Sequence, residues 1–427
     1  MGAARAVTSP EVAELVGCVA YRGDMDVLEP VVQPYAWGSR RIIADLLGRP
    51  APSDAPEAEL WMGAHPAAPA GLTRAGERTT LDRVVEQAPE RELGAVVSER
   101  FEGRLPFLLK VLAAEKSLSI QVHPDRDTAR AAFAAQRERG VQPLDPEATY
   151  ADDWPKPEIV CALTPFEALA GMREAGEAAG LLRALGVEAL APVVERLDEG
   201  DDAGLVEALR TLLAWPQDAR GDLLTRVVEA ADELAESDGE HAGAYRAVVR
   251  AAADHPGDLG AVATLLLNHT ILQPGEGLYL AAGGLHAYLR GAGVEILANS
   301  DNVLRAGLTG KRIDVAELCR ILDPAVGVPI LRPEPDDDGV STYVAPVPEF
   351  RLYRVDRTGG SVLLPGTGPR IVLNVAGIAQ LNVAGSDGAD EEIVLPRGGS
   401  AYLSAADGPV TCTGAATLFV ACPGDLS

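Results

Sequence analysis

A change in hydrophobic periodicity near the middle of the chain constrains the fold more than any other feature. From Glu167 to about Ala253, Ala, Leu and Glu dominate, and apolar residues recur at helical spacing, as at Leu205, Leu209 and Leu212. The regions on either side carry short apolar runs punctuated by Pro and Gly, a pattern typical of strands and loops. We therefore predict an α-helical insertion within a chain that is otherwise mainly β.

The C-terminal region is predicted to be a small β-sandwich or jelly roll, because short β runs recur along it. These runs cover residues 351–355, 370–375, 378–383 and 417–420. Outside the insertion we expect helices near 127–139 and near 314–322, the second with Asp314 as its N-cap. A weak internal repeat relates 273–282 to 395–405, each a Pro/Gly turn leading into a strand. It favours two related β-barrels, and chance similarity of two β-turns is the alternative.

Composition and charge exclude several classes of protein. The net charge of −26 argues against nucleic acid as a partner, because a phosphate backbone requires basic surface. No run of eighteen apolar residues exists, so no transmembrane helix is expected, and the N-terminus lacks a signal pattern. We therefore expect a cytoplasmic protein. The five cysteines are scattered without a CxxC pair, which predicts buried, reduced thiols rather than a disulfide framework. They are Cys18, Cys161, Cys319, Cys412 and Cys422.

Three short runs contain residue types that bind metals. They are Leu118-Ser-Ile-Gln-Val-His-Pro-Asp, Lys156-Pro-Glu and Gly283-Gly-Leu-His-Ala-Tyr-Leu. The imidazoles of His123 and His286, the carboxylate of Glu158 and the amide oxygen of Gln121 together suit a divalent metal such as zinc. These runs predict a metal site with a substrate pocket around it.

Strand periodicity sharpens this hypothesis for the first run. If residues 117–123 form a strand, Ser119, Gln121 and His123 share one face, and the alternating apolar residues share the other. A barrel strand with a polar inner face would present two ligands to one ion. A solvent-facing strand with ordinary polar residues is the alternative.

The other two runs also have alternative interpretations. Lys156 and Glu158 share a strand face, so Lys156 would face the substrate beside a carboxylate ligand, unless the two form a surface ion pair. His286 follows a Gly-Gly turn and shares a face with Tyr288, although a lone histidine there can be purely structural. Of the remaining histidines, His241 and His255 are expected to be solvated, while His65 and His269 are undecided.

Residues 291–312 concentrate acids, amides and bases next to the predicted ligand strand. The polar residues are Glu295, Asp301, Asn302, Arg305, Lys311 and Arg312. Such a cluster suits sugar-phosphate recognition, since Arg and Lys would hold the phosphate while Glu or Asp moves a proton. A polar loop with structural salt bridges is the alternative.

Taken together, these segments resemble the type I phosphomannose isomerase (mannose-6-phosphate isomerase) family, zinc enzymes of the cupin class. The matching segments follow the family's order over about residues 28–325. They are Tyr35-Ala-Trp-Gly, Glu59-Leu-Trp-Met-Gly-Ala-His-Pro, Pro106-Phe-Leu-Leu-Lys-Val-Leu, the three runs above, Ser300-Asp-Asn-Val-Leu-Arg-Ala-Gly-Leu-Thr and Lys311. The chain departs from the family at Gly291-Ala292 and Gly310-Lys311, which bears on loop shape rather than on a proposed ligand.

The resemblance implies cupin-type jelly-roll β-barrels plus a helical domain. The predicted division places a catalytic cupin domain at 25–165 and 264–330, the helical insertion domain at 166–263, and a C-terminal cupin-like β domain without metal at 331–427. Met25 reads like a natural start, so residues 1–24 are expected to be a disordered extension.

The resemblance also implies a zinc-dependent aldose–ketose isomerase that interconverts mannose 6-phosphate and fructose 6-phosphate through a cis-enediol, feeding mannose metabolism and GDP-mannose supply. One Zn²⁺ per chain would be bound by Gln121, His123, Glu158 and His286. The implied catalytic residues are Arg305, Glu295 and Lys156, and the implied substrate-binding residues are Ser119, Lys110, Asp301, Tyr288 and Lys311.

The identity of the catalytic base is left open between Glu295, which we prefer as a shielded carboxylate, and a water held by the metal. Guanidinium groups rarely give up a proton, so Arg305 is assigned to charge stabilisation or phosphate contact. A non-catalytic sugar-phosphate-binding cupin is the main alternative function, and the intact polar cluster argues against it. A metal-dependent oxygenase is disfavoured by the glutamine ligand. We expect a sugar-phosphate substrate, no nucleic acid or membrane partner, and a monomer or weak homo-oligomer.

Overall fold

The computed structural model of the chain describes residues 25–143, 145–237, 239–384 and 390–426, so the predicted extension lies outside the described residues. Strand accounts for 30% and helix for 29%, which is more helix than a mainly β chain implies. The described residues form two compact units. The first unit runs up to Ala113 and includes Gly293–Asn299 and the chain from Leu331 onward. The second unit comprises Ala114–Ala292 and Ser300–Ile330. The predicted domain limits stay a prediction.

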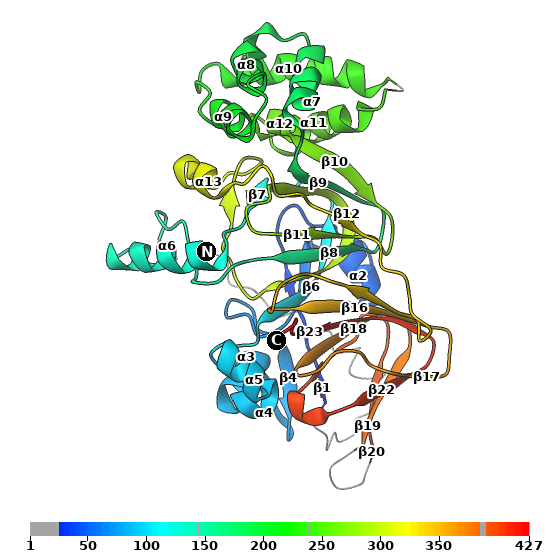
Figure 1. The fold of residues 1–427 in the computed structure, drawn as a ribbon. Coiled ribbons are helices and arrows are strands. Elements are labelled where there is room, and N and C mark those ends of the chain that lie inside the picture. Colours follow the sequence, from blue (N-terminus) through cyan, green and yellow to red (C-terminus); the bar gives the residue numbers. More distant parts are fainter. Residues whose placement is uncertain (1–24, 144, 238, 385–389, 427) are drawn as a thin grey trace. The chain divides into compact units, whose positions relative to one another are not determined.

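Two antiparallel sheets form the C-terminal part of the first unit (Figure 1). The six-stranded sheet has the order β1 (Asp26–Val27), β21 (Ser400–Leu403), β18 (Arg370–Gly377), β23 (Ala416–Cys422), β16 (Arg351–Arg357) and β15 (Val340–Tyr343). The four-stranded sheet has the order β17 (Ser361–Leu363), β22 (Val410–Thr413), β19 (Ala379–Ala384) and β20 (Asp390–Leu395). Both sheets contribute side chains to one buried cluster, as expected for a sandwich, and this cluster includes Val372, Leu381 and Val420. The four predicted β runs are therefore confirmed as β16, β18, β19 and β23.

The rest of the first unit combines short strands and short helices. Strand β3 (Glu59–Met62) pairs antiparallel with β2 (Val31–Gln33) and with β6 (Phe107–Ala114), while β4 (Gly71–Arg74) pairs with β5 (Glu77–Thr80). The helices are α2 (Ile42–Leu46), α3 (Leu81–Gln87), α4 (Pro89–Leu93) and α5 (Ala95–Arg100), and a 3₁₀ turn covers Ala405–Asp407. The register of β3 and β6 places Trp61 directly opposite Lys110.

The second unit contains short antiparallel strand pairs. Strand β8 (Glu158–Ala162) pairs with β11 (Gly277–Leu280), and β9 (Phe166–Met172) pairs with β10 (Leu267–Leu272) and with the start of β12 (His286–Ala298). Strand β7 (Gln121–Val122) pairs with β12 and with β13 (Leu304–Arg305). Strand β14 (Ile330–Leu331) lies at the unit boundary. Strand β8 also neighbours β12 in the sheet order, so the predicted ligand segments lie on or beside neighbouring strands.

Helices of the second unit gather beside β9 and β10, in green in Figure 1. They are α7 (Ala175–Ala184), α8 (Ala191–Leu197), α9 (Asp202–Leu213), α10 (Arg220–Ala235), α11 (Ala242–Asp254) and α12 (Gly260–Ala263), with 3₁₀ turns at Glu188–Leu190 and Thr264–Leu266. Their buried faces, including Leu205, Leu209 and Leu212, share one core cluster with Ile120 and Val122. The helical periodicity seen in the sequence is therefore confirmed for this part of the chain.

The two helices predicted outside this region are also present. Helix α6 (Arg126–Glu138) begins after Asp125, whose side chain accepts a hydrogen bond from the Thr128 amide. Helix α13 (Val315–Ile321) begins after Asp314, which is the predicted N-cap. Its side chain accepts a hydrogen bond from the Glu317 amide. Both aspartates satisfy an amide that the first helical turn leaves without a partner.

Two local predictions are wrong. Residues 166–172 form strand β9 rather than helix, because hydrogen bonding to β10 and β12 outweighs the helix propensity of Ala, Leu and Glu. Residues 117–120 are not strand, since Leu118 donates to the Tyr288 carbonyl and Ile120 to the Gly307 carbonyl, outside any ladder. The predicted alternation still holds in part, because Leu118, Ile120 and Val122 are all buried.

Among the described residues, no helix has the length and apolar character needed to cross a membrane. The four described cysteines, Cys161, Cys319, Cys412 and Cys422, form no disulfide, and all but Cys319 are buried, whereas Cys18 lies outside the described residues. The two repeat segments each form a turn followed by a strand, β11 and β21, as predicted. A relationship between two barrels stays a prediction.

Candidate metal centre

Three buried side chains of the second unit converge as a possible metal site. The ligand atoms of His123, Glu158 and His286 all lie within 4.8 Å of one another. His123 Nε2 lies 3.5 Å from Glu158 Oε1, and His286 Nε2 lies 3.7 Å from Glu158 Oε2. The two imidazole centroids are 5.0 Å apart. The alternative of a purely structural His286 is thereby weakened, since the ring faces a buried carboxylate and a second imidazole.

Backbone carbonyls orient both imidazoles. His123 Nδ1 lies 2.7 Å from the Asn302 carbonyl, and His286 Nδ1 lies 3.1 Å from the Gly284 carbonyl, so each Nδ1–H donates to an oxygen. This tautomer leaves the Nε2 lone pairs facing Glu158, and the buried Nε2 of His123 has no hydrogen-bond partner. Metal-binding histidines are commonly oriented in this way by the nitrogen that does not bind the metal. The unpaired buried nitrogen fits a metal ion.

Burial keeps the imidazoles neutral and nearby charges keep the carboxylate ionised. Burial lowers the pKa of His123 and lowers that of His286 to about 4. Burial alone would raise the pKa of Glu158, but the Lys156 ammonium, 2.8 Å away, outweighs it and holds this pKa well below its usual range. Neutral imidazole and ionised carboxylate are the forms that bind divalent metals. Near neutral pH the cluster is therefore ready for a cation.

Lys156 is buried and contacts Glu158 directly. Its Nζ lies 2.8 Å from Glu158 Oε1, and both side chains are at least nine-tenths buried. The alternative of a surface ion pair is therefore wrong. Lys156 and Glu158 therefore lie side by side in the protein interior, and contact of Lys156 with a substrate stays a prediction.

The register places Gln121 and Arg305 in one row with His286. Gln121 pairs with His286 across β7 and β12, and with Arg305 across β7 and β13. Directly opposite residues project from the same face of a sheet, so the three side chains share a face. Gln121 Nε2 donates to the Ser119 hydroxyl at 3.1 Å, which fixes the amide end of this side chain. Ser119 and Gln121 are therefore in contact, although Ser119 lies outside the strand.

Two cations, Arg305 at the end of β13 and Lys311 six residues later, interact electrostatically. Arg305 is largely buried, and burial lowers its pKa. The neighbouring Arg305 charge, followed by burial, lowers the pKa of Lys311. Two like charges held together attract an anion strongly, because a bound anion removes their mutual repulsion. Asp301 is an exposed acid just before β13, and its carboxylate opposes both of these pKa shifts. Its amide donates to Asp152.

Tyr288 packs within the second unit rather than lining open solvent. Its ring is buried, 6.0 Å from the His286 ring and in an edge contact with Phe166 at 5.2 Å. It is therefore a neighbour of the metal cluster, as the shared strand face predicted. Regular strand alternation would place Arg290 on the same face, but β12 has a bulge between Tyr288 and Arg290, and Arg290 is exposed.

Lys110 and Glu295 form a buried charged cluster in the first unit. Lys110 Nζ lies 2.8 Å from Glu295 Oε2 and 3.3 Å from Glu59 Oε1. Trp61 Nε1 donates to Glu59 Oε2 at 2.6 Å, and the Lys110 ammonium lies 5.9 Å from the Trp61 ring centre. Glu295 is shielded from solvent, as expected, but it is salt-bridged rather than isolated. The part played by Glu59 and Trp61 was not predicted.

Sequence reasoning also missed the hydrogen-bond network behind His123. Asn302 is fully buried; its amide oxygen accepts from the Ala151 amide at 2.8 Å, and its amide nitrogen donates to the Trp154 carbonyl at 2.8 Å. The Asp152 carboxylate accepts from the Ser300 hydroxyl and the Asp301 amide, both at 2.8 Å. This network ties residues 151–154 to residues 300–302. The high density of polar residues after Ser300 was the only signal of this network in the sequence.

The fold and the site define a metalloprotein whose His₂Glu cluster is oriented by backbone carbonyls. The sequence profile described as "Phosphomannose isomerase type I, catalytic domain" matches residues 25–175. The mannose-6-phosphate isomerase of Escherichia coli (strain K12) is 37% identical over 387 residues, covering 90% of this chain and 95% of that protein. The Rattus norvegicus mannose-6-phosphate isomerase is 33% identical, covering 88% and 93%. The chain belongs to the type I phosphomannose isomerase family.

Solved structures agree with this membership. The structure of mannose 6-phosphate isomerase from Salmonella typhimurium bound to substrate (fructose 6-phosphate) and zinc matches with a TM-score of 0.83 at 33% identity. It covers 94% of this chain and 100% of that chain. A zinc-bound holo mannose 6-phosphate isomerase structure gives the same TM-score, identity and coverage. The backbone of this family is therefore shared over nearly the whole chain.

Proposed function

We propose that this protein is a mannose-6-phosphate isomerase that interconverts mannose 6-phosphate and fructose 6-phosphate. The observation that carries the proposal is the buried cluster of His123, Glu158 and His286, whose Nε2 atoms both face the carboxylate. Membership of the family and the substrate-bound Salmonella structure support it. The product would feed mannose metabolism and GDP-mannose supply.

The metal of this site is one zinc ion per chain, held by His123, Glu158, His286 and the amide oxygen of Gln121. The zinc-bound relatives and the neutral imidazoles support this assignment. When bound, zinc supplies Lewis acidity that stabilises negative charge on the substrate oxygens. Gln121 is assigned from its place opposite His286 in the strand register.

The substrate-binding residues are proposed as Ser119, Lys110, Asp301, Tyr288 and Lys311. Lys311 and Arg305 are paired cations, which suits contact with the phosphate dianion or with developing negative charge. The Lys156 ammonium is proposed to donate a hydrogen bond to a substrate oxygen. Ser119 carries a hydroxyl on the same face as Gln121 and provides a further hydrogen-bond partner.

Isomerisation moves two protons. A base takes the C2 proton of open-chain mannose 6-phosphate while O1 gains a proton, which gives a cis-enediol. The base then returns its proton to C1 as O2 loses one, which yields fructose 6-phosphate. Glu295 is the proposed base, because it is a buried carboxylate that an ammonium holds in place at 2.8 Å. Arg305 contacts the phosphate or stabilises the charge that develops on the oxygens.

The finer description of the fold is also proposed here. We assign a catalytic cupin domain to 25–165 and 264–330, a helical insertion domain to 166–263, and a cupin-like β domain without metal to 331–427. The observed helices α7 to α12 support the insertion, and the two sheets that share a core support the third domain. We further propose a cytoplasmic protein, a monomer or weak homo-oligomer, without nucleic-acid or membrane partners.

The test is isomerase activity on mannose 6-phosphate, followed by coupled detection of fructose 6-phosphate. Enzyme is assayed as purified, after chelation, and after zinc is returned. Loss on chelation and recovery with zinc are the expected results. A folded, zinc-loaded protein without turnover would support the alternative, a non-catalytic sugar-phosphate-binding protein. An Arg305→Ala variant that loses substrate affinity but keeps its turnover number would restrict Arg305 to phosphate contact.

A further inference from the structure

The end of the helical region is tied to the segment that leads into the metal cluster. Asp254, the last residue of α11, accepts from both the amide and the hydroxyl of Ser117 through Oδ2, at 2.8 and 2.9 Å. The next residue, His255, donates from Nε2 to the Ser117 carbonyl at 2.7 Å. The expectation that His255 is solvated is therefore wrong. The three bonds clamp Ser117, two residues before Ser119.

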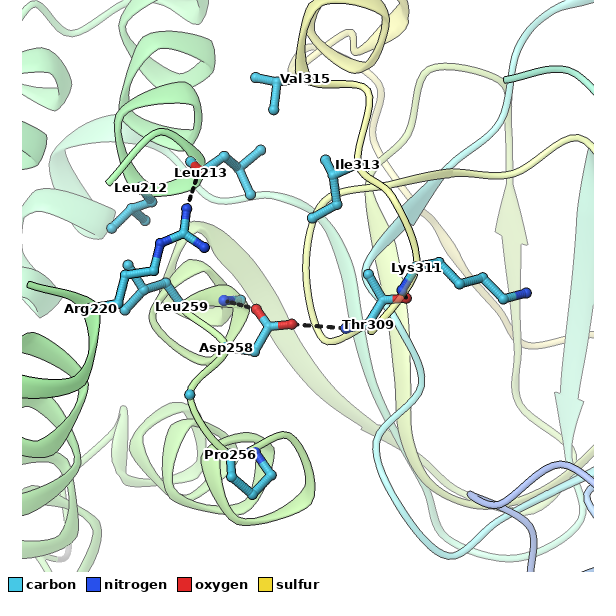
Figure 2. A pocket seen from close by; sticks show the side chains of 12 residues that line it. Leu212, Leu213, Arg220, Pro256, Asp258, Leu259, Thr309, Lys311, Ile313 and Val315 are labelled. Carbon is cyan, nitrogen blue, oxygen red and sulfur yellow. Dashed lines mark hydrogen bonds between the residues drawn. The ribbon is translucent and has the colours of Figure 1, made fainter. Parts of the chain in front are cut away.

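Residues 254–260 also hold the segment that carries Arg305 and Lys311. Asp258 accepts from the Gly260 amide at 2.7 Å and from the Thr309 amide at 2.9 Å (Figure 2). The backbones are in close approach there, since a Cβ on Gly307 would lie 2.6 Å from Gly260 Cα. Thr309 in turn accepts through its hydroxyl from the Lys311 amide at 3.1 Å. The Asp258 carboxylate is thus linked to Lys311 through two successive hydrogen bonds, with Thr309 between them.

The two clamped segments also pair with each other. Ala306 donates to the Ile120 carbonyl at 2.8 Å, and Ile120 donates to the Gly307 carbonyl at 3.1 Å. Arg305 pairs with Gln121 in the β7–β13 register. A displacement of either segment therefore changes where Arg305 and Gln121 lie relative to each other.

A cavity leaves the cation segment without dense packing on one side. It has a volume of about 480 Å³ and is lined by Leu212, Arg220, Pro256, Asp258 and Ile313, among others (Figure 2). In Figure 2 the Lys311 side chain extends away from Arg220 and Asp258. The Asp258 hydrogen bond to the Thr309 amide restrains this segment where it borders the cavity.

We propose that residues 254–260 form a brace, in which Asp258 is a positioning residue for Arg305 and Lys311. The helical region then acts by holding the binding segments in register, without touching the substrate. This inference rests on the proposed function, in which those two cations contact the substrate. It predicts that loss of the brace weakens substrate binding and leaves the metal cluster intact.

The first test compares Asp258→Ala with Asp201→Ala. Asp201 is a matched control, because its carboxylate also caps a backbone amide, that of Gly204 at 2.7 Å, within the same helical region. For Asp258→Ala we expect KM for mannose 6-phosphate to rise about tenfold, with kcat changed less than about threefold. Bound zinc per chain stays unchanged. Asp201→Ala is expected to lose similar thermal stability and to keep the parent KM.

The second test does not depend on turnover. Deuterium exchange of the peptide covering residues 305–313 is expected to become faster in Asp258→Ala and to stay unchanged in Asp201→Ala. Unchanged exchange in Asp258→Ala, or an equal rise in KM for both variants, overturns the brace. Absence of isomerase activity in the parent enzyme refutes the proposed function instead, while the exchange result still decides the brace. If Asp258→Ala does not fold, Asp258→Asn replaces it, with about a threefold rise in KM because one acceptor remains.

Discussion

Replacing Asn302 by alanine should weaken metal binding although the side chain does not touch the metal cluster. The Asn302 carbonyl accepts from His123 Nδ1 at 2.7 Å and thereby sets the imidazole tautomer. The side chain holds that carbonyl in place, because its amide accepts from the Ala151 amide and donates to the carbonyls of Asp152 and Trp154, each at 2.8 Å. Alanine removes all three of these hydrogen bonds. The carbonyl that accepts from His123 Nδ1 then belongs to a backbone that no side chain of residue 302 anchors.

The magnitude follows from burial. Asn302 is 0% exposed, and each buried polar group left without a partner costs about 1–3 kcal/mol, so we expect about 3 kcal/mol less unfolding free energy once water and relaxation recover part of the loss. Zinc affinity should fall about 10- to 100-fold, the usual effect of removing a group that orients a ligand. Competition with a chromophoric chelator measures the affinity, and thermal unfolding of the zinc-free protein measures the stability.

Asn374→Ala is the matched control. Asn374 is also 0% exposed and donates to the carbonyls of Gly377 and Leu395 at 3.1 and 2.9 Å, but it belongs to the first unit, whereas the metal cluster belongs to the second. We expect a comparable stability loss with parental zinc affinity. The reasoning is refuted if Asn302→Ala keeps zinc affinity within about threefold of the parent, or if both variants lose it equally.

Three further substitutions test other parts of the argument. Glu295→Gln should lower kcat about 100-fold or more with little change in KM, as measured by steady-state kinetics, and near-normal turnover would exclude Glu295 as the base. Lys311→Ala should raise KM about tenfold and reduce the salt dependence of kcat/KM, whereas an unchanged KM would remove Lys311 from the phosphate site. Arg74→Ala should cost about 3–5 kcal/mol in chemical denaturation, because Asp26 and Glu92, 3% and 0% exposed, both lose the Arg74 guanidinium. A loss below about 1 kcal/mol would show that water compensates those carboxylates.

Helices with local signals were predictable from the sequence. Helix α6 begins at the Asp125 cap and α13 at the Asp314 cap, each a bond between a side chain and an amide three residues away. The chemistry of the metal cluster was equally visible, because His123, Glu158 and His286 are residue types with few alternative uses when buried together. Strand β9 was not predictable in this way, because its Ala-rich sequence favours helix and only pairing with β10 makes it a strand.

The sequence by itself determined which side chains carry the chemistry and where helices begin, because caps and periodicity act between residues a few positions apart. Tertiary structure alone decided how those side chains are used. It set Gln121 opposite both His286 and Arg305, turned the His123 ring with the Asn302 carbonyl, and paired Glu295 with Lys110. Each of these contacts joins residues distant in the chain, so strand register and burial decide them, and neither is encoded in any short stretch of sequence.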